Sequence, residues 1–212
     1  MKLYSFFNSS TSYRVRIALA LKGLDYEYAS VNLRAREQRE RHYRNLSPAG
    51  IVPTLLDGDT KLTQSLAIID YLDQVYPPPR LVPETIELRI RALEIAQTIA
   101  CEIHPINNLR VLNYLTGQLA VTADAKTAWY KHWVEEGLAA VEDLLADASS
   151  GDYCVGDAAT VADCCLIPQV ANALRMGCDV EKFARIQQIY RHCISLPAFI
   201  KAAPQNQIDF LQ

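Results

Sequence analysis

The order of short patterned segments in the first 79 residues constrains the fold of this chain more than any other feature. Residues 1–5 and 26–33 alternate between apolar and polar side chains, as half-buried strands do. Between them, residues 13–22 follow the period of a helix that ends at Gly23. A strand, a helix and a second strand within about thirty residues form a βαβ unit, whose two strands run parallel. We therefore expect an α/β fold at the start of the chain.

A strongly charged segment, residues 34–45, follows the second predicted strand. It carries five arginines interleaved with two glutamates. Mixed charges of this kind are typical of a solvent-exposed helix face, which we favour over an anion-binding patch.

A hairpin and a helix complete the first part of the chain. Two apolar runs, residues 51–56 and 61–63, flank an Asp-Gly turn, which is a hairpin signature. Residues 66–75 form an amphipathic pattern that ends before three consecutive prolines, residues 77–79. The order of elements is therefore βαβ, helix, two strands, helix.

Beyond these prolines the sequence predicts helices only. The segment that begins at Thr160 starts with a capping box, in which the threonine and Asp163 satisfy each other's backbone donors. We expect an α/β domain over residues 1–79 and an all-α domain over residues 84–212. The four candidate helical segments are residues 88–119, 129–145, 159–176 and 183–195.

Composition restricts the classes of partner. The 21 basic and 24 acidic residues give a formal charge of −3, which provides no general attraction for nucleic acid or an anionic membrane. No apolar run approaches the roughly 18 residues needed to span a bilayer. We expect neither nucleic acid nor a membrane as a partner.

All six cysteines lie beyond residue 100, and none belongs to a Cys-x-x-Cys pair. The first residues lack the apolar core of a secretory signal, so we expect a cytoplasmic protein with reduced thiols. Ligand pairs at two- to four-residue spacing are missing, and we expect no metal site.

Polar residues at two predicted helix starts are candidates for an anion site. Residues 9–12 supply four hydroxyls before the first helix, and Gln64 and Ser65 precede the helix at 66–75. A helix start presents unpaired N–H groups and partial positive charge. The alternative is plain capping, because serine and threonine are preferred caps. Pro53 cannot donate within a sheet, so it marks an edge, a bend or a cis bond.

Five motifs, taken together, resemble the zeta-class glutathione transferases. Three of them lie in the first half and match that family's signature and later motifs, and two lie in the second half. The second-half motifs fit the bacterial branch of maleylacetoacetate and maleylpyruvate isomerases. In sequence order the motifs are residues 9–19, 52–55, 64–69, 104–110 and 160–163.

This resemblance implies a thioredoxin-like domain that binds glutathione, followed by a helical domain that contributes the substrate pocket. Val52, before a cis proline, would pair its backbone with the cysteinyl unit of glutathione. Gln64 and Ser65 would hold the γ-glutamyl end, and Gln38 would reach the glycyl end. Asn108 would also contact glutathione.

The resemblance places Ser9, Ser10 or Thr11 beside the thiol sulfur as the catalytic hydroxyls. A free thiol has a pKa of about 8.5, so hydrogen bonds to the sulfur must stabilise the thiolate near neutral pH. Many members of the family have cysteine where this chain has Thr11, which argues against thiol-disulfide exchange but leaves isomerisation possible. The maleylpyruvate isomerase pattern also has threonine there, but it has arginine in place of Asn8.

The implied reaction turns a cis double bond into a trans one by addition of a thiolate, rotation and elimination. The substrate is a dicarboxylate, so the resemblance assigns Arg110 and Arg175 to its carboxylates, with Arg175 also catalytic. Without the resemblance, surface salt bridges are the better explanation of both. His104 is a candidate donor to a substrate oxygen, or a cap where Pro105 interrupts the helix.

We therefore expect a glutathione-dependent isomerase of aromatic catabolism, with maleylacetoacetate favoured over maleylpyruvate as substrate. The alternatives are a general conjugating glutathione transferase and a non-catalytic glutathione-binding protein. The family usually forms symmetric dimers, so we expect a homodimer.

Overall fold

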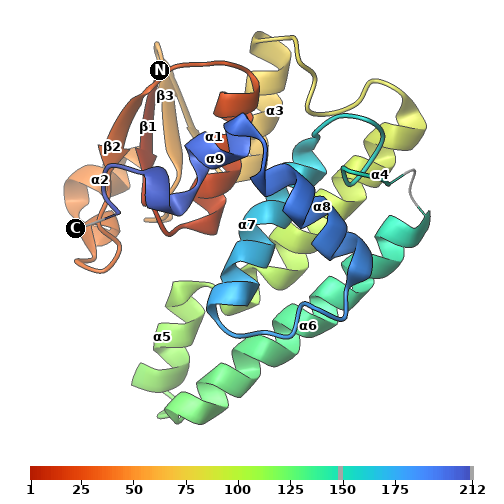
Figure 1. Ribbon diagram of the computed structural model, residues 1–212. Helices are drawn as coiled ribbons and strands as arrows, with labels where there is room; N and C mark the ends of the chain where they lie inside the picture. The colour runs from red at the N-terminus through yellow and green to blue at the C-terminus, as the bar shows by residue number, and fades with distance from the viewer. Residues whose placement is uncertain (148–149, 211–212) are drawn as a thin grey trace. The chain divides into compact units, whose positions relative to one another are not determined.

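A four-stranded sheet organises the first part of the chain (Figure 1). Its strand order is β2-β1-β3-β4. Strand β1 (Lys2–Ser5) pairs in parallel with β2 (Glu27–Ser30), which confirms the predicted βαβ unit. Strand β3 (Thr54–Asp57) is antiparallel to β1 and forms the predicted hairpin with β4 (Thr60–Thr63).

The computed structural model describes residues 1–147 and 150–210, which fall into two compact units. The first unit is Met1–Val82 together with Ser195–Gln212, and the second is Pro83–Ile194. The predicted division assigned everything after residue 84 to the helical domain, but the segment from Ser195 belongs to the first unit instead. Local sequence patterns gave no sign of this return.

Helices cover both sides of the sheet in the first unit. Figure 1 shows α1 and α3 on one side of the sheet and α2 on the other. Helix α9 packs against α1. The helices are α1 (Ser10–Leu21), η1 (Glu37–Arg39), α2 (Arg41–Leu46), α3 (Ser65–Val75), α9 (Pro197–Ala202) and η4 (Pro204–Asn206).

The charged segment at residues 34–45 forms less helix than predicted. Arg36 adopts a left-handed conformation with φ of 64°, and Glu40 is extended, so the segment divides into the short η1 and α2. Its five arginines are exposed, which agrees with the solvent-exposed interpretation.

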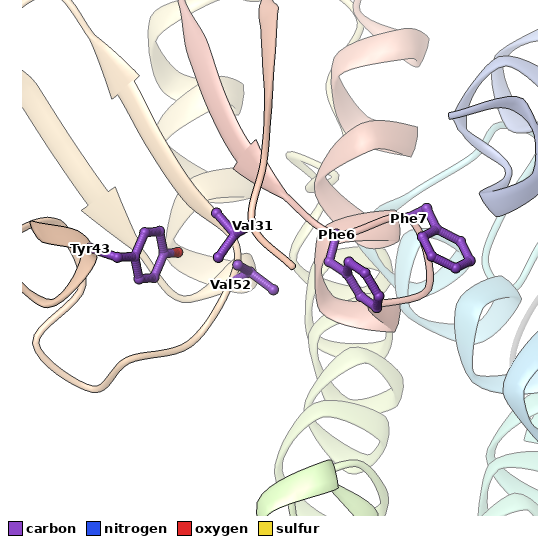
Figure 2. Close-up of a cluster of buried hydrophobic side chains, with 5 residues drawn as sticks. All are labelled: Phe6, Phe7, Val31, Tyr43 and Val52. Atoms are coloured by element: carbon purple, nitrogen blue, oxygen red, sulfur yellow. The ribbon is translucent and has the colours of Figure 1, made fainter. Parts of the chain in front are cut away.

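A cluster of buried apolar side chains supports the two loops that follow β1 and precede β3. Figure 2 shows these side chains, and Tyr4, Leu33 and Leu46 pack around them. Removing this apolar area from water stabilises the loops. The cluster consists of Phe6, Phe7, Val31, Tyr43 and Val52.

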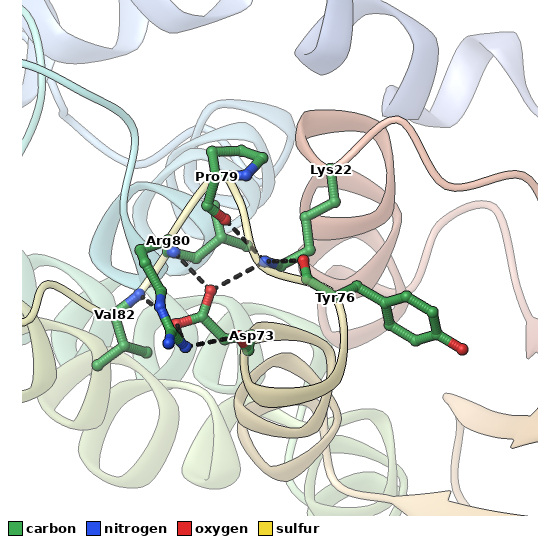
Figure 3. A network of polar contacts seen from close by, with 7 residues as sticks. Lys22, Asp73, Tyr76, Pro79, Arg80 and Val82 are labelled. Carbon is green, nitrogen blue, oxygen red and sulfur yellow. Dashed lines mark hydrogen bonds and ion pairs between the residues drawn. The ribbon is translucent and has the colours of Figure 1, made fainter.

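A buried ion pair fixes the end of α3 and the linker after it (Figure 3). Lys22 Nζ lies 2.9 Å from Asp73 Oδ1 and donates to the carbonyl of Pro79 at 2.7 Å. The Asp73 carboxylate also accepts from the backbone N–H groups of Leu81 and Val82. Both charged side chains are almost fully buried, so their charges are compensated by each other and by the backbone.

The buried Arg16 guanidinium ties the returning segment to the first unit. Its Nε donates to the carbonyl of Ala202 at 2.9 Å. Its two other nitrogens donate to the carbonyls of Phe6 and Phe7, in the loop before α1. The same side chain therefore holds α9 and that loop together.

Asp209, which is 2% exposed, makes the second connection. Its carboxylate accepts from the N–H of Phe7 at 3.1 Å, the hydroxyl of Tyr28 at 2.7 Å and the hydroxyl of Ser30 at 3.1 Å. Burial raises the pKa of Tyr28 above its ordinary value, so its hydroxyl keeps the hydrogen that it donates. These bonds explain why residues after Ser195 group with the first unit.

All the regular elements among the described residues of the second unit are helices. Helix α4 packs against α7, and both α6 and α7 pack against α8. The capping box at Thr160 and Asp163 is present as predicted. No helix in the described part of the chain is long and apolar enough to cross a membrane. The elements are α4 (Ile86–Gln97), η2 (Thr98–Ile103), η3 (Pro105–Asn107), α5 (Leu109–Gly117), α6 (Ala123–Asp147), α7 (Val161–Arg175) and α8 (Ala184–Ile194).

The predicted helical segment at residues 88–119 is interrupted. The N–H of His104 donates to the carbonyl of Ile99, five residues back, which gives the π-helical form of η2. Pro105 then starts a turn of 3₁₀ helix. A Cβ at Gly137 of α6 would overlap the side chain of Ile103, so α6 approaches η2 closely there.

All six cysteines are free, and five are buried. Burial raises the pKa of the Cys154 and Cys164 thiols well above the ordinary value, which keeps them protonated. Cys101 is exposed. Among the described residues no group of three or more histidine, cysteine or acidic side chains is arranged to hold a metal ion.

Candidate active site

The start of α1 carries the hydroxyl cluster predicted from the sequence. Ser9 is the cap of the helix, and its Oγ accepts from the N–H of Ser12 at 3.2 Å. Ser10 is 5% exposed. The capping interpretation of Ser9 is therefore correct, although a hydroxyl that accepts one bond still has a hydrogen to donate.

A chain of hydrogen bonds connects this cluster to the loop before β3. Ser9 Oγ and Thr11 Oγ1 are 2.9 Å apart, and Thr11 Oγ1 donates to the carbonyl of Val52 at 3.0 Å. A carbonyl can only accept, so the single hydrogen of Thr11 goes to Val52. Ser9 is then the donor to Thr11. The two hydroxyls form a directed chain from α1 to Val52.

The Val52–Pro53 bond is cis, as the resemblance implied. Val52 itself is buried in the apolar cluster of Figure 2. Gln38 is half-buried, and its Oε1 has no hydrogen-bond partner among the residues that the structure describes. Gly50, with φ of 60°, lies against the Gln38 carbonyl, where a Cβ would come within 2.8 Å. This loop thus combines a close backbone approach with an unpaired side-chain acceptor.

Gln64 and Ser65 form the start of α3. Gln64 has φ of 71°, which costs a residue other than glycine on the order of 1–3 kcal/mol. No side-chain hydrogen bond caps α3 at Gln64. The capping alternative considered for this position is therefore not what the structure contains, and the helix start is left for another acceptor.

Arg14 is a candidate that sequence analysis does not assign. It projects from α1, is 1% exposed and donates from Nη1 to Ser65 Oγ at 3.3 Å. Its Nε and Nη2 have no hydrogen-bond partner in the described residues. The available signal was the pair of arginines within the otherwise apolar helix, because a charge buried in a core needs a reason.

In the second unit, His104 and Asn108 lie together. Asn108 caps α5, and its Oδ1 accepts from the N–H of Arg110 at 3.1 Å. Asn108 Nδ2 and His104 Nε2 are 3.3 Å apart. An amide nitrogen can only donate, so in this contact His104 Nε2 is the acceptor. His104 is the residue before η3, and its side chain makes no capping hydrogen bond there.

The two candidate arginines of the second unit are exposed. Arg175 donates from Nη2 to Asn172 Oδ1 at 2.9 Å. Within the described residues, neither Arg110 nor Arg175 forms an ion pair with a carboxylate, unlike Arg185, whose Nη1 lies 3.6 Å from Glu142. Their charges are therefore not neutralised in the way that a surface salt bridge would neutralise them.

Asn107 is a further residue that sequence analysis does not assign. It is 9% exposed, and neither atom of its side-chain amide has a partner among the residues described. An unpaired buried amide typically costs about 1–3 kcal/mol. The sequence offered only the repeated asparagine beside Pro105 as a signal.

Known proteins resemble this chain along its whole length. Residues 1–74 match the family of the glutathione S-transferase N-terminal domain. A probable maleylacetoacetate isomerase of Vibrio cholerae is 47% identical over 210 residues, which cover 98% of this chain and 97% of that protein. The holo structure of a bacterial zeta-class maleylpyruvate isomerase has a TM-score of 0.96 at 43% identity, and the match covers 99% of both chains. A maleylacetoacetate isomerase of Methylobacterium extorquens AM1 with bound malonate and glutathione is 34% identical, with a TM-score of 0.94 and 98% of both chains covered.

Proposed function

Because the chain belongs to the zeta-class glutathione transferase family, we propose that it is a glutathione-dependent isomerase of a maleyl dicarboxylate. Maleylacetoacetate is the favoured substrate and maleylpyruvate the next, in the breakdown of aromatic compounds. The relatives with 47% and 43% identity carry these two activities in their names. The relative from Methylobacterium extorquens that holds malonate with glutathione supports a dicarboxylate site.

One observation carries the proposal: two hydrogen bonds join the three motifs of the first unit that the family uses for glutathione. Thr11 connects the start of α1 to Val52, and Arg14 connects α1 to Ser65 at the start of α3. The bonded residues are 41 and 51 positions apart in the sequence. Tertiary structure has therefore gathered the motifs around one place.

Several polar groups of the first unit fit glutathione. The start of α3 has no side-chain cap, and Gln38 Oε1 and two nitrogens of Arg14 lack partners among the described residues. We propose that Gln64 and Ser65 bind the γ-glutamyl end and that Gln38 binds the glycyl end. Val52 and Asn108 complete the set of contacts.

Bound glutathione supplies the thiolate that adds to the alkene and leaves after rotation about the resulting single bond. The chain's own task is to favour the thiolate. Each unit by which the pKa of a thiol falls needs about 1.4 kcal/mol of differential stabilisation. The N-terminus of α1 and the hydroxyls of Ser9, Ser10 and Thr11 are the groups available for it.

The hydroxyl chain determines how that stabilisation is delivered. In the structure the hydrogen of Thr11 goes to Val52 and that of Ser9 goes to Thr11. For Ser9 or Thr11 to donate to sulfur, its hydroxyl must turn from its protein acceptor. Rotation of the hydroxyl about its C–O bond is enough to redirect its hydrogen to the sulfur. The carbonyl oxygen of Val52 has two lone pairs and can accept from another donor.

Cations of the second unit serve the substrate. We propose that Arg110 and Arg175 bind the two carboxylates and that Arg175 stabilises the negative charge that develops during reaction. We propose that His104, which contacts Asn108, lies beside the substrate as a donor to one of its oxygens. None of these roles requires a thiol of the protein.

The decisive experiment follows the absorbance of maleylacetoacetate and of maleylpyruvate, each with and without glutathione. Glutathione-dependent loss of either substrate supports the proposal, and the relative rates rank the two. Glutathione binding without turnover of either substrate would favour a non-catalytic role. Turnover of an apolar electrophile instead would favour a conjugating transferase.

We further propose a two-fold homodimer in the cytoplasm, as is usual for this family. Sedimentation equilibrium at micromolar concentration would give twice the 23.8 kDa chain mass if this is right. A single-chain mass would contradict it.

A further inference from the structure

Helix α1 buries two arginines that are bonded very differently. Arg14 and Arg16 are 1% and 0% exposed. Every nitrogen of Arg16 donates to a protein oxygen, and three of its acceptors are backbone carbonyls. Arg14 has a single bond, from Nη1 to Ser65, and its Nε and Nη2 have no partner in the described part of the chain.

This difference is large in free energy terms. A buried charge is tolerated when it is paired or fully hydrogen-bonded, and an unpaired one is strongly destabilising. Arg16 meets that condition through the fold itself. Arg14 does not, so the fold holds a guanidinium whose hydrogen-bonding capacity is mostly unused.

The surroundings of Arg14 indicate what would use it. Its Nη1 lies 3.3 Å from the hydroxyl oxygen of Ser65, the first residue of α3. The start of α3 has no side-chain cap. A helix start, a hydroxyl and a guanidinium are three groups that bind a carboxylate, and here they are adjacent.

We propose that Arg14 is a positioning residue for the γ-glutamyl carboxylate of glutathione, an inference that rests on the proposed function. Arginine can only donate, so Ser65 Oγ accepts from it and directs its own hydrogen elsewhere. Ser65 is thereby prepared as a donor to the carboxylate. The uncompensated charge of Arg14 attracts the same group through a medium of low dielectric constant.

This arrangement couples binding to stability. The carboxylate offsets a positive charge that forms no ion pair with any described residue, so part of the cost of burying Arg14 is recovered when glutathione binds. Glutathione should therefore raise the Tm of the natural protein more than that of a variant without the charge.

The test compares the natural protein with Arg14→Met, Arg14→Lys and Arg44→Met. Arg44 is exposed and controls for the loss of one positive charge. Calorimetry gives the Kd of glutathione and of γ-aminobutyryl-cysteinyl-glycine, which lacks only the γ-glutamyl carboxylate. Thermal unfolding of each protein without ligand measures any purely structural effect.

We expect Arg14→Met to raise the Kd of glutathione about 10- to 100-fold and Arg14→Lys to raise it less. The analogue should bind to the natural protein and to Arg14→Met with similar affinity, and Arg44→Met should bind as the natural protein does. Equal losses for both ligands, or unchanged glutathione affinity in Arg14→Met, would overturn the role of Arg14.

Two further outcomes are also decisive. Failure of the natural protein to bind glutathione at all would overturn the proposed function itself, and the Arg14 role with it. If Arg14→Met does not fold, Arg14→Lys should still discriminate less between glutathione and the analogue than the natural protein does. Equal discrimination by those two proteins would refute the inference.

Discussion

The two regions that carry the candidate site residues are built on different principles. In the first unit, polar groups are buried or half-buried and bonded across 41 to 51 residues of sequence. In the second unit, the side-chain hydrogen bonds of Asn108 and of Arg175 span two to four residues, and both candidate arginines are exposed. Residues of the first region are therefore part of the fold, whereas the second region can change its cations at little cost to stability.

The largest expected effect tests whether the first region is tied into the fold. Asp209→Ala removes a buried acceptor and leaves the donors of Phe7, Tyr28 and Ser30 without it. We expect the free energy of unfolding in urea to fall by about 3–5 kcal/mol. Asp25→Ala is the control, because the Asp25 side chain is 98% exposed and should change stability little. Equal effects of the two substitutions would refute the contrast.

Arg175→Ala tests the second region. Because this side chain is exposed and, among the described residues, hydrogen-bonds to Asn172 alone, stability should be unchanged. We expect kcat/KM for isomerisation to fall about 100-fold, since a charge that binds carboxylate and developing negative charge is lost. Glutathione affinity should stay the same. Arg191→Ala, an exposed arginine at the end of α8, is the control for kinetics and unfolding. A drop in Tm without a change in kcat/KM would show that Arg175 has a structural role instead, and would contradict the contrast between the two regions.

Ser65→Ala should show the opposite kinetic pattern. It removes the hydroxyl that accepts from Arg14, so the Kd of glutathione should rise about 10-fold, equivalent to about 1.4 kcal/mol. At saturating glutathione, kcat should change little. Calorimetry and steady-state titration of glutathione measure the two quantities. Equal losses in both, for this variant and for Arg175→Ala, would contradict the separate roles.

The smallest expected effect concerns the packing that interrupts the second region. Gly137→Ala places a methyl group against Ile103 of η2, and overpacking of this kind costs about 1–2 kcal/mol. Gly117→Ala is a matched control, because a Cβ there meets nothing within 4 Å in α5. Thermal unfolding should show a lower Tm for the first variant alone. If both behave alike, close approach of α6 does not shape η2.

Sequence analysis predicted the features that depend on neighbouring residues better than those that depend on residues distant in sequence. The βαβ unit, the Asp-Gly hairpin and the capping box at Thr160 rest on neighbouring residues, and all three are present. Pro105 predicted an interruption within residues 88–119, and a turn of 3₁₀ helix begins there. The π-helical turn before it was not predicted, and it lies where Gly137 of another helix approaches Ile103.

The buried arginines show the same limit. Arg14 and Arg16 are two residues apart, so they cannot share one face of an amphipathic helix. From the sequence, either arginine could therefore lie on an exposed side of the helix, or both could be buried in a helix that is covered on all sides. Only the packing of α3 and α9 against α1 decides between these, and both partners are distant in sequence.

The return of residues after Ser195 to the first unit has a consequence for synthesis. The acceptors that complete this unit, the Ala202 carbonyl and the Asp209 carboxylate, leave the ribosome only after all of residues 83–194. Until then the Arg16 Nε and the Phe7 N–H must be satisfied by water. The unit that is translated first is thus the one whose packing is completed last.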